Sequence, residues 1–133
     1  MNPRVGTATV AMSPSEVNGR AQQARDFLET AQLALEIGPN SAASNAVLAG
    51  IAAGDAICGK ALGIRSHSGS HGDAVAIVRR AHGGESAANH LKALVALKSA
   101  AAYEPRMVTA AKASEAVQHA ERLVVAMEKL LKT

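Results

Sequence analysis

The stretch from Ser41 to Leu62, SAASNAVLAGIAAGDAICGKAL, decides the fold of this 133-residue chain. It is apolar on almost every side, which is typical of a helix buried by several neighbours. Alanine is the best helix former, and its small side chain lets helices approach closely. The stretch therefore predicts a central helix, capped by Asn40 or Ser41, with other helices packed around it.

A first helix is expected to begin after Ser13. The sequence Ser13-Pro14-Ser15-Glu16 combines an N-cap serine, a proline at the first helical position and the glutamate of a capping box. Gly38-Pro39 ends the helix. Its apolar residues recur at steps of four and three and form one stripe: Val17, Ala21, Ala24, Leu28, Ala31 and Leu35. Residues 1–12 show no period and are expected to form a flexible lead.

The second half of the chain predicts three more helices. After a polar loop over residues 63–72, a short helix spans about 73–81 and ends before Gly83-Gly84. A long helix follows over about 85–103, with Leu91, Leu94, Leu97 and Ala101 facing inward, until Pro105 ends it. Thr109 caps the last helix, whose stripe is Ala113, Val117, Ala120, Val124, Met127 and Leu131.

These elements predict an all-α protein, an antiparallel four-helix up-down bundle with one extra short helix. A chain of this length fits one domain, assigned here to residues 13–133. The sequence holds one Phe, one Tyr and no Trp, and a β-domain would be richer in aromatic and β-branched residues.

Charge and cysteine content narrow the classes of function. Lys and Arg outnumber Asp and Glu by 14 to 11, a net charge of +3, well short of the basic patches of dedicated DNA binders. The single cysteine, Cys58, lies in an apolar stretch, which suits a reducing cytoplasm. No signal-peptide pattern opens the chain, and the longest apolar run is shorter than the ~20 residues that cross a bilayer. A cytoplasmic protein without a membrane span is therefore expected.

The order of these elements resembles the HEPN superfamily (higher eukaryotes and prokaryotes nucleotide-binding domains), in particular small stand-alone members from actinobacteria and their phages. The matching residues are Ser44-Asn45-Ala46, Asp55, Leu62-Gly63-x-Arg65-Ser66, His71, Leu97-Lys98, Tyr103 and Ala113 to Val124. The resemblance covers about residues 15–130. It implies a HEPN-like helical bundle that forms a homodimer, in a toxin–antitoxin, defence or phage-conflict setting.

HEPN members that cut RNA carry Arg-x(4–6)-His near the end of the penultimate long helix, and two such motifs meet across the dimer. A metal-independent ribonuclease needs a proton acceptor for the 2′-hydroxyl and a cation for the phosphate. At the matching place this chain has Lys98 and Tyr103, and tyrosine, with a pKa of about 10, is a poor general base. The resemblance thus implies the fold and the dimer without the activity. Lys98, Tyr103 and Arg106 remain the candidates for any catalysis.

The polar loop and the helix after it carry a second set of candidates. Arg65, His67, His71, Arg79 and Arg80 are candidate anion-binding residues, since the short helix would direct its first amides towards the loop. The alternative is a solvated basic edge. The histidine spacing is too loose to predict a metal site. Arg65 and His71 also have the spacing of the nuclease motif, but they lie in the wrong loop and chance supplies about one such match.

Four residues of the central helix stand out. Asp55 and Asn45 are expected to be buried polar residues, and a buried carboxylate requires a partner. For Asp55 the partner is Lys98, Tyr103, an arginine or a helix N-terminus, unless it marks a site at the bundle centre. Gly50 and Gly54 each cost about 1 kcal/mol in a helix. Close approach by another helix or by a partner subunit would offset that cost, and we assign them to an interface.

The sequence thus supports two hypotheses of function. The first is a non-catalytic HEPN-like protein that acts through homodimerisation and association with a second protein, such as an antitoxin or a host or phage protein. The alternative is a divergent ribonuclease toxin, or a module that binds RNA or a nucleotide. Neither hypothesis requires a cofactor.

Overall fold

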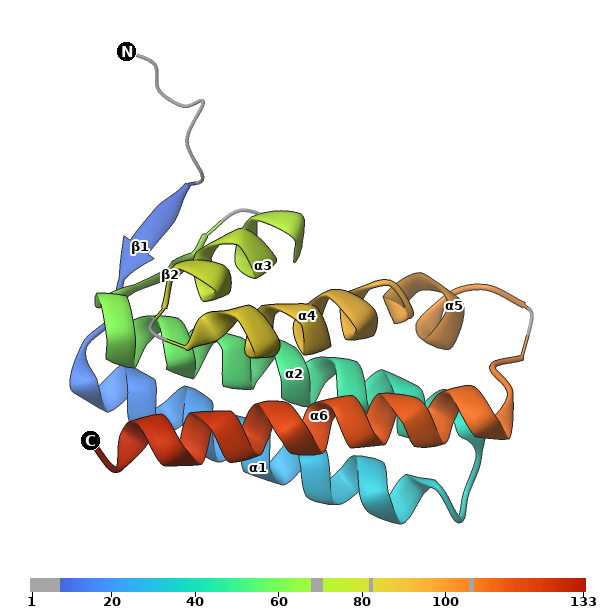
Figure 1. Cartoon of the computed structure of the whole chain (residues 1–133). Helices are drawn as coiled ribbons and strands as arrows, with labels where there is room; N and C mark the ends of the chain where they lie inside the picture. The colour runs from blue at the N-terminus through green and yellow to red at the C-terminus, as the bar shows by residue number, and fades with distance from the viewer. Residues whose placement is uncertain (1–7, 68–70, 82, 106) are drawn as a thin grey trace.

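In the computed structural model, the residues described are 8–67, 71–81, 83–105 and 107–133. Within these ranges the chain forms six helices and one small two-stranded antiparallel sheet (Figure 1). The elements are β1 (Thr9–Ala11), α1 (Pro14–Ala34), α2 (Pro39–Leu62), β2 (Ile64–Ser66), α3 (His71–Arg80), α4 (Gly84–Val95), α5 (Lys98–Ala102) and α6 (Ala110–Leu131). An all-α fold was expected; the structure is mostly helical, with six helices in place of five and two short strands that the sequence did not predict.

Helix α2 is the centre of the fold, as its apolar sequence predicts. It contacts all five other helices and β2. Figure 1 shows α1 and α6 on one side of it and α3, α4 and α5 on the other. Its length and mean hydropathy of 1.3 would also suit a membrane span, yet 72% of that window is buried within the fold. This degree of burial is what a core helix has.

The start of α1 follows the predicted capping box. Ser13 Oγ accepts a hydrogen bond of 3.1 Å from the Glu16 amide, and the Glu16 carboxylate accepts one of 2.8 Å from the Ser13 amide. These bonds lower the pKa of Glu16. The end of the stripe was predicted wrongly: the helix stops at Ala34, which is buried, and Leu35 in the following turn is half exposed.

The end of the expected flexible lead is ordered, which corrects that prediction for residues 8–12. Strand β1 pairs antiparallel with β2, with Val10 opposite Arg65. Met12 then enters the core, where Gly59 leaves room for its side chain. Gly63 ends α2 in the left-handed conformation, with a φ of +74°, so that the chain can turn into β2 and pair with β1. A strand of three residues is too short to show a period in sequence. Residues 1–7 lie outside the described residues.

The start of α2 differs from the prediction, because neither Asn40 nor Ser41 caps it. The N-cap is Gly38, which has no side chain to bond the first amides, and Pro39 is the first residue of the helix. The Asn40 side chain donates to the Ala101 carbonyl at 3.0 Å and accepts from the Val108 amide at 3.0 Å. Asn40 therefore ties α2 to the end of α5 and to the connection before α6.

The helix expected over residues 85–103 is two helices. At Leu97 the backbone amide donates to the Leu94 carbonyl, a tighter bond than the i to i−4 bonds of an α-helix. This turn separates α4 from α5, and α5 packs on α2, where Asn40 holds Ala101. The inward positions Leu91, Leu94 and Ala101 are buried as predicted.

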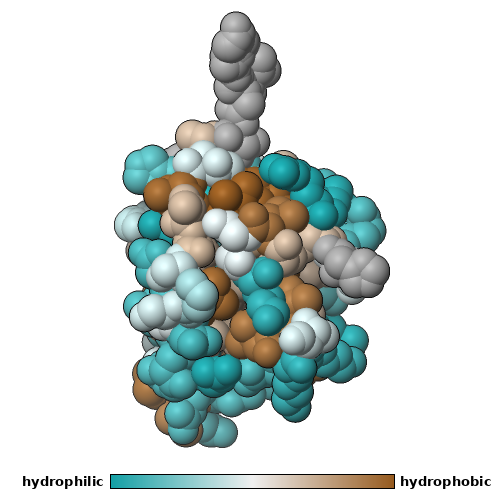
Figure 2. Space-filling model, turned by 90° about the vertical axis from the view of Figure 1, so that its left-hand side faces the viewer, coloured by the Kyte–Doolittle hydropathy of each residue, from teal (hydrophilic) through white to brown (hydrophobic). Residues whose placement is uncertain are grey.

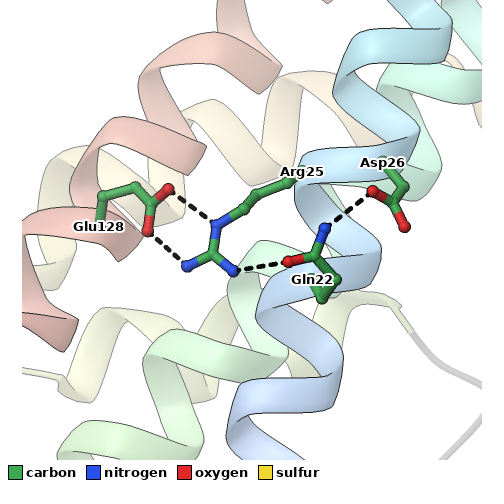
Figure 3. Close-up of polar contacts among 4 residues, drawn as sticks. All are labelled: Gln22, Arg25, Asp26 and Glu128. Atoms are coloured by element: carbon green, nitrogen blue, oxygen red, sulfur yellow. Dashed lines mark hydrogen bonds and ion pairs between the residues drawn. The ribbon is translucent and has the colours of Figure 1, made fainter.

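A bidentate ion pair connects the long helices α1 and α6 (Figure 3). Arg25 donates to both carboxylate oxygens of Glu128, at 2.9 and 2.7 Å, and also to Gln22 at 3.1 Å. The hydrogen bonds raise the pKa of Arg25 and lower that of Glu128. About two turns further along α1, the Gln32 side chain donates to the Glu121 carboxylate at 2.9 Å. Glu121 and Glu128 of α6 thus both accept hydrogen bonds from side chains of α1.

One end of the molecule carries apolar side chains at its surface. Figure 2 shows the end of the molecule where α1 begins and where α2 and α6 end. Apolar side chains lie at this surface among polar ones. A hollow of about 330 Å³ lies beside the start of α1. Its lining includes Met12, Val17, Gly59, Lys60 and Leu131. These residues close the end of the core and hold no group of reactive side chains.

Candidate functional site

Lys98 and Tyr103, two of the predicted candidates, lie at the same place in the fold. They stand at the start and at the C-cap of α5, and both line a hollow of about 140 Å³ between α5 and α2. The rest of its lining is Ser44, Val47, Leu48 and Ala102. Tyr103 is 77% exposed and Leu48 is 42% exposed. The third candidate, Arg106, lies outside the described residues.

The described lining of this hollow combines polar and apolar side chains. Its described lining offers an ammonium group from Lys98, a phenol from Tyr103 and a hydroxyl from Ser44, beside three apolar side chains. Neither a histidine nor a carboxylate is among these residues.

The predicted basic loop does not form one cluster. Arg65 is half-buried in β2 and donates to the Ser66 carbonyl at 3.1 Å, while His67 is exposed and joined to Ala8 through its backbone. His71 is the first residue of α3, and its side chain is outside the description. Nothing in the described geometry gathers these side chains around a common point.

The two arginines of α3 lie at its far end. Arg79 forms an ion pair with Glu85 and also contacts Asn89, so it links α3 to α4. Arg80 is exposed in the same last turn. Six to seven residues separate them from Asp73 in the first turn, which is about 9–10 Å along the axis at 1.5 Å per residue. The arrangement therefore places the arginines away from the N-terminal amides of α3.

Asp55 has an arginine partner, one of the predicted alternatives. Arg20 of α1 approaches Asp55 Oδ2 through two nitrogens, both at 3.0 Å. The side chain of Asp55 is 14% exposed and that of Arg20 is 29% exposed. Asn45 is half-buried and donates to the Ser41 carbonyl of its own helix. Both residues are therefore only partly buried, which corrects the expectation of fully buried polar groups.

Gly50 and Gly54 face the interior of the same chain, where another helix packs against them, the first of the two predicted alternatives. A Cβ on Gly50 would lie 2.4 Å from Leu94 Cδ1, and one on Gly54 would lie 3.2 Å from Leu91 Cδ2. Both glycines are buried under these α4 leucines. The close approach that was predicted comes from another helix of the chain.

His90 of α4 and His119 of α6 form a pair to which the sequence analysis assigned no role. The Nδ1 atoms of His90 and His119 are 2.9 Å apart, and the ring centroids are 5.1 Å apart. Burial lowers the pKa of His90, and His119 and Arg122 lower it further by charge repulsion. The only sequence signal is that the two residues adjoin the stripe positions Leu91 and Ala120. Their contact depends on the packing of α4 against α6.

A groove of about 510 Å³ lies beside this pair, between α4 and α6. His90 lines it, together with the α6 residues Arg122 and Lys129 and the apolar residues Val125 and Ala126. Across the described part of the chain, no three His, Cys, Asp or Glu side chains group in a way that would hold a metal ion. The groove and the α2–α5 hollow are thus the two candidate sites.

Comparisons with known proteins add no assignment. No protein-family model matches the chain, and no significant match was found among curated proteins or solved structures.

Proposed function

We propose that this chain is a HEPN-like four-helix up-down bundle with extra short helices, and that it acts in the cytoplasm through homodimerisation and protein association, without catalysis. The observation that carries this proposal is the hollow between α2 and α5. There Tyr103 and Leu48 present apolar surface to solvent instead of to the core.

The chemistry of that surface supports association. Tyrosine is enriched at protein interfaces because it adds a large apolar ring with a polar end, and lysine is typical of a rim. A two-fold axis just outside this face of α2 would bring the hollow of one copy against Tyr103 of the other, so that one patch serves both copies. A stable dimer needs about 800 Å² of buried surface per partner. The exposed parts of α2 and α5 would supply the centre of such an area.

The size of the particle in solution tests this proposal. Analytical ultracentrifugation of the full chain is expected to give a dimer, and Leu48→Lys is expected to give a monomer with an unchanged helical circular dichroism spectrum. The matched control is Leu33→Lys, since Leu33 is 65% exposed on α1 and lies outside this hollow. A wild-type monomer at all concentrations, with no partner captured from the host, would contradict the proposal. So would equal dissociation by both variants.

A second candidate rests on the same hollow, because Lys98 and Tyr103 both line it. A divergent ribonuclease, or a module that binds RNA or a nucleotide, would use the ammonium group to hold a phosphate and the phenol to donate a hydrogen bond. Expression of such a toxin is expected to arrest growth, and Tyr103→Phe or Lys98→Ala would relieve the arrest. Harmless expression and intact total RNA after incubation with the protein would eliminate the nuclease.

A further inference from the structure

The groove between α4 and α6 has the features of a binding site on a different face from the α2–α5 hollow. The two helices lie side by side in Figure 1, and the groove between them has a volume of about 510 Å³, within the range of small-molecule sites. Its lining residues are Gly83, Ser86, Ala87, His90, Gln118, Glu121, Arg122, Val125, Ala126 and Lys129.

The charged side chains of α6 have different partners. The carboxylates Glu128 and Glu121 are engaged by α1, through Arg25 and Gln32 respectively. The cations Arg122 and Lys129 face the groove, and neither forms an ion pair or hydrogen bond with any residue that the structure describes. Glu121 also lines the groove and keeps its negative charge, because the Gln32 amide that donates to it is neutral. The groove lining therefore carries two cations and one carboxylate, an excess of one positive charge.

His90 adds a directed polar group to the same wall. Its Nδ1 faces His119 at 2.9 Å, which leaves Nε2 as the ring nitrogen free for a ligand. When His119 donates to Nδ1, the neutral His90 ring must carry its proton on Nε2, because one imidazole nitrogen then accepts and the other donates. Arg122 lies close enough to lower the pKa of His90. With that tautomer, the Nε2–H of His90 and the Arg122 guanidinium are two neighbouring donors at this part of the groove.

The groove also has apolar surface, beside the polar side chains of Ser86 and Gln118. Ala87 of α4 and Val125 and Ala126 of α6 lie between the polar residues, and Val125 is half exposed. Arg122 and Lys129 are seven residues apart, about 10 Å along α6. The groove can therefore hold an anionic group near His90 and Arg122 and an apolar group along Val125 and Ala126, with Lys129 at the other end.

We propose that the α4–α6 groove binds a small organic anion, a molecule that joins a carboxylate or phosphate group to an apolar ring or chain. The anion lies between the Arg122 guanidinium and the His90 imidazole, and the apolar part packs on Val125 and Ala126. Binding here is independent of homodimerisation, because none of these residues lines the α2–α5 hollow.

Nuclear magnetic resonance titration of the ¹⁵N-labelled full chain tests this inference. Benzoate and phenyl phosphate are the anionic probes, and phenol is the neutral probe of similar shape. Saturable shifts are expected for both anions at amides of the first turns of α4 and of residues 118–129, and phenol is expected to bind far more weakly. Arg122→Gln is expected to weaken anion binding about tenfold, since a charge-assisted hydrogen bond is lost.

Lys92→Gln is the matched control, because Lys92 is an exposed cation on α4 that does not line the groove. It removes the same charge and is expected to leave the affinity within about twofold of the wild type. Equal affinity for phenol, equal weakening by the two variants, or shifts confined to other surfaces would each overturn the proposal. The Leu48→Lys variant is expected to bind the probes like the wild type, which separates this site from the proposed association surface.

Discussion

Gly50 leaves the space that Leu94 fills. A Cβ at position 50 would lie 2.4 Å from Leu94 Cδ1 and 3.3 Å from Leu123 Cδ1, and both leucines are fully buried. At Gly54 the nearest atoms are more distant, at 3.2 and 3.4 Å. The cost of a glycine inside a helix, about 1 kcal/mol, is therefore offset at position 50 by leucine packing and less so at position 54.

Alanine substitutions should reveal this difference in urea unfolding. Gly50→Ala is expected to lower the free energy of unfolding by about 1–2 kcal/mol, because Leu94 must leave its rotamer in a packed core. Gly54→Ala is expected to change it by less than about 1 kcal/mol, since strain and helix propensity oppose each other. The control is Gly19→Ala in α1, where a Cβ meets nothing within 4 Å and a gain of up to about 1 kcal/mol is expected. A Gly50→Ala variant as stable as Gly19→Ala would refute the packing argument.

The Arg20–Asp55 pair is also a residue-scale feature, with distances of 3.0 Å and little exposure of the carboxylate. Asp55→Asn is expected to lower the free energy of unfolding by about 1–2 kcal/mol, because a charge-assisted bond is lost in a partly buried place. A double-mutant cycle with Arg20→Gln should give a coupling of about 1 kcal/mol. The reference pair is Lys112–Glu115, 3.9 Å apart and mostly exposed, whose coupling should be near zero. Equal couplings would show that burial adds nothing at Asp55.

At the scale of elements, the contact of α4 with α6 should make stability depend on pH. Burial, His119 and Arg122 hold the pKa of His90 below its usual value, so the unfolded chain takes up a proton at a higher pH than the folded chain. The free energy of unfolding is therefore expected to fall as the pH drops through about 6.5, the ordinary histidine value. Above that value this contribution is fully present.

Urea unfolding at about pH 7.5 and about pH 5.5 measures this effect, in a window where most carboxylates do not titrate. His90→Gln should reduce the difference in stability between the two conditions, because the titrating group is removed. His67→Gln is the control, since His67 is exposed in the described structure and lies outside the α4–α6 contact. A pH dependence that is unchanged in His90→Gln would contradict this origin.

Local signals predicted the elements that depend on neighbours in sequence. The capping box at Ser13 and the cap at Thr109 are present because their partners lie three residues away. The break at Leu97 carries no Gly or Pro, and it follows from the packing of α5 on α2. Strand β1 depends on a partner more than fifty residues away, so the pattern of residues 1–12 gave no sign of it.

The candidate site shows the same limit at the scale of the whole molecule. Lys98 and Tyr103 are five residues apart on one short helix, so their common position was predictable. His90 and His119 lie on different helices, and only the register of α4 against α6 brings them together. The glycines at positions 50 and 54 predicted close approach by a neighbouring helix or by a partner subunit, and only the structure shows that the neighbour is a helix of the same chain.

The reactivity of Cys58 should report the opening of the whole molecule. This thiol is 2% exposed on α2, the helix that contacts every other described helix, and burial together with nearby Asp55 raises its pKa to about 12. Disulfide exchange requires the thiolate, so dithionitrobenzoate at about pH 8 should label the native protein very slowly and the urea-unfolded protein at once. The labelling rate should rise in Gly50→Ala by about tenfold for each ~1.4 kcal/mol of lost stability, provided that reclosing is faster than labelling. Because the chain holds one cysteine, the signal has a single source. Rapid labelling of one thiol per native chain would mean that α2 is reached by local fluctuation, and that the helices around it do not open as one unit.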